Sequence, residues 1–370
     1  MTQIKVIGIV GGGQLGRMLT QSAKRQGYTV IILDPQKNCP ASQVCDEHIM
    51  APFDDANALQ KLGELSDVVT FEFENIDSDK LNQCIPNSKL PQQTHLLRLT
   101  QHRIREKESL NALGIQTVNW RAVSTVEELQ QAVAEIGYPC VLKTTRFGYD
   151  GKGQVVLKNT ADIAQTTQLL NEQACILEEW LTFEKEVSVM VSRNPQGECS
   201  FFPVAENVHV NNILHTSMVP ARLSKQTTEQ VRRYTEKIAN AFQLVGTLGI
   251  EYFVTAEGEV FVNELAPRPH NSGHYSIEAC NFSQFDTSIQ AVCGLPMPNI
   301  HLLSSAVMVN VLGQHLSLMH QLRCEQAMWH FHDYGKNEAK HNRKMGHMTI
   351  LTDNCEEVLA HIEQLYAPYQ

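Results

Sequence analysis

Residues 249–271 constrain the fold most strongly, because they can form a β-hairpin that places two carboxylates opposite each other. Both arms are rich in β-branched and aromatic residues, and Glu257-Gly258 between them suits a two-residue turn. Such a turn pairs Glu251 with Glu264, whose Cβ atoms would lie roughly 4.5–5.5 Å apart. Like charges at that distance repel, so the pair predicts a cation between them, and carboxylates together with substrate phosphates are typical Mg²⁺ ligands. The alternative is two rim glutamates on an exposed hairpin.

Three polar side chains follow the second arm of this hairpin. Arg268 and His270 are potential donors to an anion, and Asn271 adds an amide. An anion site beside a metal site indicates phosphoryl chemistry.

The N-terminal segment predicts a βαβ unit. A continuous apolar strand over residues 4–10 suits a buried parallel sheet. It leads into a glycine-rich turn at residues 11–16, a helix to about residue 26 and a second strand over residues 28–33. The GxGxxG spacing, followed by Asp34, is the usual fingerprint of a dinucleotide site. The alternative is that the helix N-terminus binds a different phosphate, because it attracts any anion.

A third strand is predicted over residues 68–71. Because the carboxyl ends of parallel strands form the ligand-facing edge of such a sheet, Glu72 is a candidate ligand contact. A solvated loop acid is the alternative.

The composition shifts near residue 98, where we place a domain boundary. A charged helix over residues 101–113 and a second helix over residues 125–136 precede a short strand that ends at Lys143. The glycine-rich residues 144–154 then suit a flap whose backbone N–H groups close over phosphates. The GxxxxGK[ST] order of a P-loop is absent.

The segment after this flap predicts mixed α and β structure. We expect a strand over residues 154–157, a helix over 161–170 and a strand that ends at residues 176–181. Residues 184–191 alternate like a half-buried strand.

Composition narrows the class of protein. The 370 residues are 42% hydrophobic and 19% charged, which is typical of a globular chain of two or three domains. The net charge of −10 argues against a nucleic-acid or acidic-membrane partner. The ten cysteines form no CxxC pair, no leader is evident, and no apolar run approaches the roughly 20 residues that cross a bilayer. We therefore expect a cytoplasmic protein whose cysteines are reduced and mostly buried.

Ordered motifs identify a family. Four features together resemble those of an ATP-grasp domain. They are Lys143 before the flap, the strand end at residues 178–181, Glu186 and the hairpin acids. A set of short stretches resembles the N5-carboxyaminoimidazole ribonucleotide synthetases, in the same order and across nearly all of the chain. These stretches are GGGQLGRM, FEFEN, RFGYDGKGQ, NELAPRPHNSGHYSIEAC, and YGK followed by RKMGH.

This resemblance implies an α/β ATP-grasp fold. Residues 1–98 would form an N-terminal Rossmann-like parallel-sheet domain, residues 99–295 the ATP-grasp domain, and residues 296–370 a small C-terminal domain that completes the ribonucleotide site. A homodimer is also implied.

The implied reaction joins bicarbonate to 5-aminoimidazole ribonucleotide with consumption of ATP, giving ADP, phosphate and the N5-carbamate. Mg²⁺, or Mn²⁺ in its place, would be the cofactor. Bicarbonate is a poor electrophile, and its phosphorylation to carboxyphosphate supplies a better leaving group. The amine would then react in a water-poor pocket, where positioning replaces a bimolecular encounter.

The resemblance also assigns roles to individual residues. Glu251 and Glu264 would hold the metal, and Arg268, His270 and Asn271 would bind bicarbonate and carboxyphosphate. The residues expected around ATP are Arg103, Lys143, Gly148, Tyr149, Asp150, Gly151, Lys152, Gly153, Gln154, Glu178, Glu179, Trp180, Leu181, Glu186, His209, Asn263 and Glu264. The residues expected around the ribonucleotide are Glu72, Tyr149 and Asp150, with Lys336 and Arg343 on its phosphate. A structural histidine at His209, and a solvated basic face at Lys336 and Arg343, are the alternatives.

Other classes of protein would use some of the same features. A nicotinamide-dependent oxidoreductase would use the glycine turn for pyrophosphate and Asp34 for ribose hydroxyls, but it leaves the flap and the opposed glutamates without a task. A formate-using glycinamide ribonucleotide transformylase and a biotin carboxylase share the ATP-grasp fold, and labelled formate or bicarbonate separates them. A non-catalytic nucleotide-binding module would release no ADP.

Overall fold

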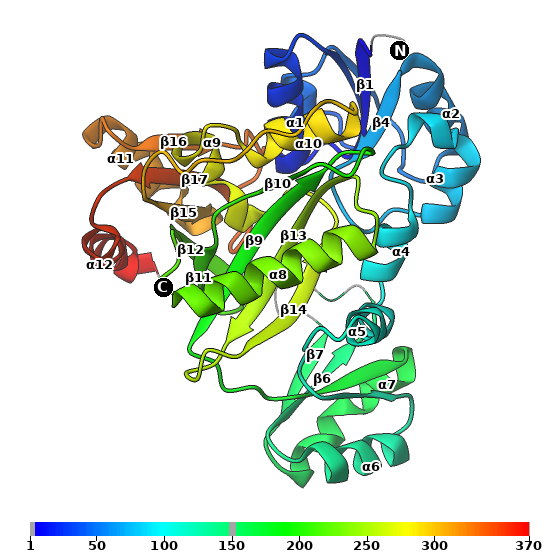
Figure 1. The fold of residues 1–370 in the computed structure, drawn as a ribbon, viewed down its shortest axis with the longest axis vertical. Helices are drawn as coiled ribbons and strands as arrows, with labels where there is room; N and C mark the ends of the chain where they lie inside the picture. The colour runs from blue at the N-terminus through cyan, green and yellow to red at the C-terminus, as the bar shows by residue number, and fades with distance from the viewer. Residues whose placement is uncertain (1–3, 147, 149–152, 370) are drawn as a thin grey trace.

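The computed structural model describes residues 4–146, 148 and 153–369. Within these residues the chain forms three sheets with helices packed on them (Figure 1).

The N-terminal residues form a four-stranded parallel sheet in the order β3-β2-β1-β4. The strands are β1 (Val6–Val10), β2 (Thr29–Leu33), β3 (Glu47–Ile49) and β4 (Val68–Phe71), and the helices between and after them are α1 (Gln14–Arg25), α2 (Ala56–Leu65) and α3 (Ser78–Cys84). The predicted βαβ unit and the strand at residues 68–71 are therefore confirmed. The short edge strand β3 has too few apolar residues to be recognised from its sequence.

Both faces of this sheet are covered, as the continuous apolar character of β1 predicts. Ile7 and Ile9 pack against α1 and against Phe285 and Ile289 of α10 (Gln284–Val292), a helix from much later in the chain. Figure 1 shows α10 beside α1. Val10 lies in a second cluster with apolar residues of α2. The N-terminal sheet is thus joined to the rest of the molecule by a shared core.

A second, antiparallel sheet follows in the order β5-β8-β6-β7. Its strands are β5 (Trp120–Val123), β6 (Cys140–Thr144), β7 (Gln154–Leu157) and β8 (Cys175–Glu179), and the helices of this region are α4 (His95–Thr100), α5 (Arg103–Ala112), α6 (Val126–Ile136) and α7 (Thr167–Glu172). The helix expected over residues 161–170 is wrong in part, because residues 160–166 form a 3₁₀ helix before α7 begins. Asn159 caps that turn, and its polar and β-branched residues have low α-helix propensity.

The third sheet has nine strands and runs through the centre of the molecule in the order β14-β13-β9-β11-β12-β15-β17-β16, with β10 on β9. Its strands are β9 (Lys185–Arg193), β10 (Cys199–Phe201), β11 (Ala205–Val210), β12 (Ile213–Val219), β13 (Gly246–Val254), β14 (Val260–Ala266), β15 (Ala306–Leu312), β16 (His330–Asp333) and β17 (Lys344–Leu351). The accompanying helices are α8 (Lys225–Ala241), α9 (Ser276–Ala279), α11 (Leu316–Glu325) and α12 (Cys355–Tyr366). The C-terminal strands β15 to β17 extend this sheet through the β12–β15 pairing.

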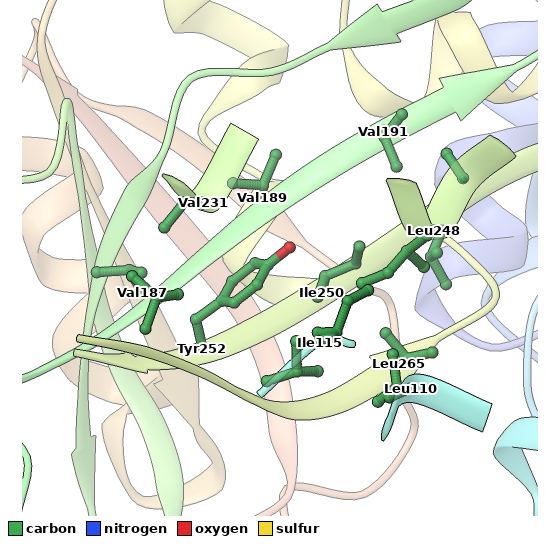
Figure 2. Packing of buried hydrophobic residues seen from close by; sticks show 14 of the residues in the cluster. Leu110, Ile115, Val187, Val189, Val191, Val231, Leu248, Ile250, Tyr252 and Leu265 are labelled. Carbon is green, nitrogen blue, oxygen red and sulfur yellow. The ribbon is translucent and has the colours of Figure 1, made fainter. Parts of the chain in front are cut away.

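The core of this sheet lies under α8. Figure 2 shows Val187, Val189 and Val191 of β9 packed with Ile250 and Tyr252 of β13, and the Tyr252 hydroxyl lies 2.8 Å from Thr235 Oγ1 of α8. Residues 187–192 are buried on both faces of the strand. The strand expected over residues 184–191 is therefore confirmed as β9, but its expected half-burial is wrong, because polar residues on its second face are buried against other elements.

The β13–β14 hairpin has the predicted pairing of Glu251 with Glu264, but its loop and its register differ from the prediction. Glu251 pairs with Glu264, as expected, but Tyr252 pairs with Val262, so Asn263 is an extra residue on β14. At the tip, Thr255 N–H bonds to Glu259 O and Gly258 has a φ of +84°, so the loop has three residues rather than two. The β-bulge at Asn263 offsets the longer loop and restores the Glu251–Glu264 register.

No helix within the described residues is long and apolar enough to span a membrane. All ten cysteines are free, but only Cys39, Cys140, Cys175 and Cys280 are buried, so the expectation of mostly buried cysteines is wrong.

Candidate active site

A cavity of about 520 Å³ is lined by residues that belong to or follow strands of all three sheets. The sequence-derived candidates that line it are Glu72, Arg103, Lys143, Gly148, Gln154, Glu186, His209, Glu251, Asn263, Glu264, Arg268, His270 and Asn271. Seven other candidates among the described residues do not line it, namely Gly153, Glu178, Glu179, Trp180, Leu181, Lys336 and Arg343. Tyr149, Asp150, Gly151 and Lys152 lie outside the described residues.

The opposed carboxylates of the hairpin face this cavity. Burial, followed by the charge of Glu264, raises the pKa of Glu251 to about 7. Arg103 Nη1 lies 3.6 Å from Glu264 Oε2, and His270 Nε2 lies 3.6 Å from Glu251 Oε1. Because of the bulge, the consecutive residues Asn263 and Glu264 both line the cavity, which a regular strand would not allow.

The oxygen donors of this pair fit a small divalent cation. Two carboxylates that destabilise each other's charge are relieved when a cation lies between them. No group of three or more His, Cys, Asp or Glu side chains in the described part of the chain could hold a metal ion by itself. This donor set therefore suits an ion that completes its coordination with substrate phosphates and water, as Mg²⁺ does.

Lys143 is held at the cavity wall by a buried carboxylate. Its Nζ lies 2.6 Å from Glu178 Oε2, and Lys107 Nζ lies 3.4 Å from Glu178 Oε1. Burial alone would raise the pKa of Glu178, but the two ammonium groups outweigh it and lower that pKa to about 2. Lys107 is only 2% exposed, and nothing in its charged helix distinguished it from its surface neighbours.

Glu178 to Leu181, expected at the adenine, lie at the end of β8. The backbone N–H of Glu179 donates to Asn119 O, and that of Trp180 donates to Pro139 O. The Trp180 side chain is about half exposed, at 49%.

A second pair links the N-terminal sheet to the hairpin. The guanidinium of Arg268 pairs with Glu74, the second acid of the FEFEN stretch. Burial raises the pKa of Glu74, although the Arg268 charge opposes this. Burial and then Glu264 raise the pKa of Glu106, which also lines the cavity. Glu74 and Glu106 are site residues that were not predicted from the sequence, although Glu74 lies two residues after the candidate Glu72.

His270 and Asn271 form one wall of the cavity. Burial, followed by Arg268, lowers the pKa of His270 well below its ordinary value, so the ring is neutral. The buried Asn271 Nδ2 has no hydrogen-bond partner among the described residues. An unpartnered buried amide is costly unless a ligand accepts from it, so this atom fits an anion bound beside His270.

Glu186 of β9 and His209 of β11 pair with each other at the cavity edge. Burial lowers the pKa of His209, but the pairing with Glu186 and the charge of Glu251 together outweigh it, so the net shift is upward. His209 thus lines the cavity, as a residue of the nucleotide site would.

The glycine-rich turn binds carboxylates of the chain itself. Gly13 N–H and Gly16 N–H donate to the two oxygens of Glu72 at 2.6 and 2.9 Å, and Gly12 N–H donates to Asp34 Oδ2 at 2.8 Å. The amides that would hold a dinucleotide pyrophosphate are thus occupied, and Asp34 is turned inward. This geometry contradicts the nicotinamide reading of the turn, and also the reading of Glu72 as a solvated acid, because Glu72 is 7% exposed.

Lys336 and Arg343 flank a loop between β16 and β17, as expected. Lys336 Nζ donates to Lys344 O at 2.7 Å, and burial, followed by Arg343, lowers its pKa to about 8. Arg343 donates to Glu338 O at 3.1 Å. Lys344, which was not among the predicted site residues, also lines the cavity.

Comparison with known proteins gives consistent matches along the whole chain. Residues 4–101 match the ribonucleotide synthetase preATP-grasp domain, residues 108–285 the ATP-grasp domain, and residues 306–361 the phosphoribosylaminoimidazole carboxylase C-terminal domain. The N5-carboxyaminoimidazole ribonucleotide synthase of Bacillus subtilis is 47% identical over 360 residues, which are 96% of this chain and 94% of that protein.

Two solved structures resemble the present one closely. An ADP complex of an N5-carboxyaminoimidazole ribonucleotide synthetase has a TM-score of 0.95 and 50% identity, covering 99% of this chain and 98% of that chain. An N5-carboxyaminoimidazole synthase from Aspergillus clavatus, in complex with ADP and 5-aminoimidazole ribonucleotide, has a TM-score of 0.90 and 31% identity, covering 99% of each chain.

Proposed function

The chain belongs to the N5-carboxyaminoimidazole ribonucleotide synthase family of ATP-grasp enzymes, and from this membership we propose how its cavity carries out the family's reaction. That reaction is the ATP-dependent formation of N5-carboxyaminoimidazole ribonucleotide from bicarbonate and 5-aminoimidazole ribonucleotide, a step of purine biosynthesis. The observation that carries the proposal is the meeting of three groups on one cavity: Lys143, the opposed acids Glu251 and Glu264, and the donors Arg268, His270 and Asn271.

ATP binds between the antiparallel β5-β8-β6-β7 sheet and strand β9. Lys143 and the N–H groups of the flap, Gly148 to Gln154, hold its phosphates, with Arg103 nearby. Glu186 and His209 hold the ribose side, and the backbone from Glu178 to Leu181 faces adenine. The Glu178 carboxylate holds the ammonium of Lys143, which lines the cavity, and this supports the role.

Bicarbonate binds against Arg268, His270 and Asn271. The Arg268 guanidinium is oriented by Glu74, and the unpartnered Asn271 Nδ2 supplies a further donor. Donors fixed before the reaction stabilise the charge that develops on carboxyphosphate without reorganisation. No side chain needs to act as a covalent nucleophile, because phosphoryl transfer depends on positioning and charge stabilisation.

The ribonucleotide binds at the edge of the N-terminal sheet. Glu72 accepts from it, Tyr149 and Asp150 contribute from the flap, and Lys336 and Arg343 hold its phosphate. The Glu72 carboxylate reaches the cavity from a fixed position, which supports this role.

Mg²⁺, or Mn²⁺, would be held by Glu251 and Glu264, with Asn263 beside the nucleotide. When bound, the ion would neutralise charge on the β- and γ-phosphates during transfer. Arg103, 3.6 Å from Glu264, keeps that carboxylate turned toward the cavity.

The division into residues 1–98, 99–295 and 296–370, a homodimer and a cytoplasmic location remain predictions.

The decisive experiment measures ADP release and the fate of labelled bicarbonate in the same reaction. We expect ADP release that depends strongly on aminoimidazole ribonucleotide and label that appears in the ribonucleotide product. Labelled formate serves as the control substrate. Incorporation of formate, or ADP release indifferent to the ribonucleotide, would contradict the proposal.

A further inference from the structure

The ring of His270 is held at Nδ1 by two groups of the turn that follows it. The backbone N–H of Ser272 donates to Nδ1 at 3.4 Å, and Ser272 Oγ lies 2.8 Å from the same atom. A backbone N–H can only donate, so Nδ1 must be the acceptor. The neutral ring then carries its proton on Nε2.

A chain of buried side chains leads to this contact from the centre of the large sheet. Ser217 Oγ–H donates to Asn207 Oδ1 at 2.8 Å, and Asn207 Nδ2–H donates to Ser188 Oγ at 3.0 Å. Ser188 Oγ–H donates to Ser272 Oγ at 2.7 Å. Since Ser272 Oγ accepts this bond, its own proton is left for His270 Nδ1. All four bonds therefore point in one direction, toward His270.

The direction of the chain is set at both ends. At one end, the backbone N–H and the hydroxyl of Ser272 both donate to Nδ1, which together disfavour a proton there. At the other, the Asn207 side chain has separate donor and acceptor atoms, and each is bonded. Reversal would require Asn207 to turn over and every hydroxyl to rotate.

The surroundings make such a reversal costly. Ser188, Ser217 and Ser272 are at most 1% exposed and Asn207 is 6% exposed, so water is excluded from most of the chain. In a medium of low polarity the bonds reinforce one another, and an unpaired group is expensive. This series of hydrogen bonds also connects β9, β11, β12 and the turn after β14, so its geometry is fixed by the sheet.

We propose that Ser217, Asn207, Ser188 and Ser272 form a hydrogen-bond relay that fixes His270 as an Nε2–H donor aimed into the cavity. The inference rests on the proposed function, in which His270 binds bicarbonate and carboxyphosphate. Nε2 lies on the side of the ring that faces the reaction centre, 3.6 Å from Glu251 Oε1. His270 therefore donates a hydrogen bond to the bicarbonate-derived oxyanion and does not act as a general base through Nε2. The four relay residues are positioning residues, because they act on substrate only through His270.

The tautomer can be observed directly in the full-length enzyme. We would label histidine with ¹⁵N and record long-range ¹H–¹⁵N correlations, with His270→Gln to assign the ring. We expect Nδ1 to give the signal of an unprotonated nitrogen and Nε2 that of a protonated one. The opposite pattern in the parent enzyme would overturn the proposal without any need for a relay variant.

Ser188→Ala interrupts the relay, and Ser192→Ala is its matched control. Ser192 lies on the same strand, is equally buried, and bonds to Thr247 and Thr287 rather than to the relay. Without the Ser188 donor, Ser272 Oγ can accept from a protonated Nδ1, and only the long 3.4 Å bond from the Ser272 backbone N–H then opposes this tautomer. The spectrum of Ser188→Ala should therefore show a second tautomer. Ser192→Ala should retain the parent spectrum.

Turnover gives a second readout. For Ser188→Ala we expect kcat to fall roughly threefold to tenfold, the usual effect of one buried hydrogen bond, with the KM for ATP unchanged. A Ser188→Ala enzyme with the parent tautomer and the parent kcat would overturn the relay. Failure of the proposed function is distinguishable, because the enzyme would then make no carbamate while the Nε2–H signal of the parent persisted.

Discussion

The carboxylate of Glu72 accepts a hydrogen bond from the backbone N–H of Gly13 at 2.6 Å, although the two residues are 59 positions apart. A Cβ at Gly13 would lie 2.6 Å from Glu72 Oε1. The glycine is therefore required by a side chain of the same protein, and not by a bound dinucleotide.

Gly13→Ala should push the Glu72 carboxylate out of place while the backbone of the turn is kept. We expect the KM for aminoimidazole ribonucleotide to rise roughly tenfold to a hundredfold, the effect of losing a hydrogen bond to a charged group, with the KM for ATP unchanged. Steady-state kinetics with each substrate varied in turn provide the measurement. Gly63→Ala, in helix α2, is the control, because its Cβ would meet no atom closer than 3.6 Å. Equal changes in both KM values would contradict the assignment of Glu72.

Glu251→Gln and Glu264→Gln should fold normally, because an amide fills the same space and removes the repulsion between the pair. Activity should fall at least roughly 100-fold, since even partners outside the metal's ligand shell cost 10–100-fold. Turnover at limiting Mg²⁺, with circular dichroism to confirm folding, checks this. Near-normal turnover in either variant would rule out the bridging role.

The raised pKa of Glu251 makes the stability of the metal-free protein depend on pH. The folded state holds a proton on Glu251 up to about pH 7, whereas the ordinary value is 4.5. This contribution to the free energy of unfolding is therefore fully present below pH 4.5 and is lost as the pH rises through about 7. Denaturant titrations in chelator should show a smaller loss for Glu251→Gln over this window than for the parent. Parallel pH profiles would contradict the prediction.

Arg268→Lys keeps the charge but loses the planar fork that pairs with Glu74. We expect kcat to fall by roughly 10²–10³, the usual cost of one donor at a developing oxyanion, while ATP binding is nearly normal. Equilibrium binding of ATP and single-turnover carbamate formation separate the two effects. Arg222→Lys is the control, because Arg222 also pairs with a buried acid, Glu206, outside the cavity. A parallel loss of ATP affinity would make Arg268 a nucleotide-site residue.

Lys336→Ala and Arg343→Ala should each raise the KM for aminoimidazole ribonucleotide and leave that for ATP almost unchanged, because a remote phosphate contact contributes binding energy. Since the pKa of Lys336 is lowered to about 8, the parent should bind the ribonucleotide more weakly as the pH rises through 8. Lys340→Ala is the control within the same loop, where Lys340 is exposed and pairs with Glu338. A selective loss of ATP affinity would move this loop to the nucleotide site.

The β13–β14 hairpin shows how much of the site could be predicted from local sequence. Turn residues and β-rich arms were sufficient to place Glu251 opposite Glu264. They did not reveal that the loop has three residues or that a bulge at Asn263 corrects the register. The extra residue in the loop and the extra residue at the bulge offset each other, so the predicted pairing of the two carboxylates was correct.

Elements and motifs whose signals are local could be predicted from the sequence. These are the βαβ unit, the strand before Glu72, the strand that carries Lys143 and the ordered stretches that mark the family. Hydrophobic periodicity and turn chemistry depend on residues within a few positions of one another, so they can be read along the chain.

Which charged groups meet depends on how the elements pack in the folded molecule. It placed Lys107 beside Glu178, Arg268 beside Glu74, and the carboxylate of Glu72 on the glycine turn. A buried charge is stable only with a partner, and that partner comes from whichever element packs against it. Such pairings leave no periodic trace in the sequence, because the contacts are made between segments that folding alone brings together.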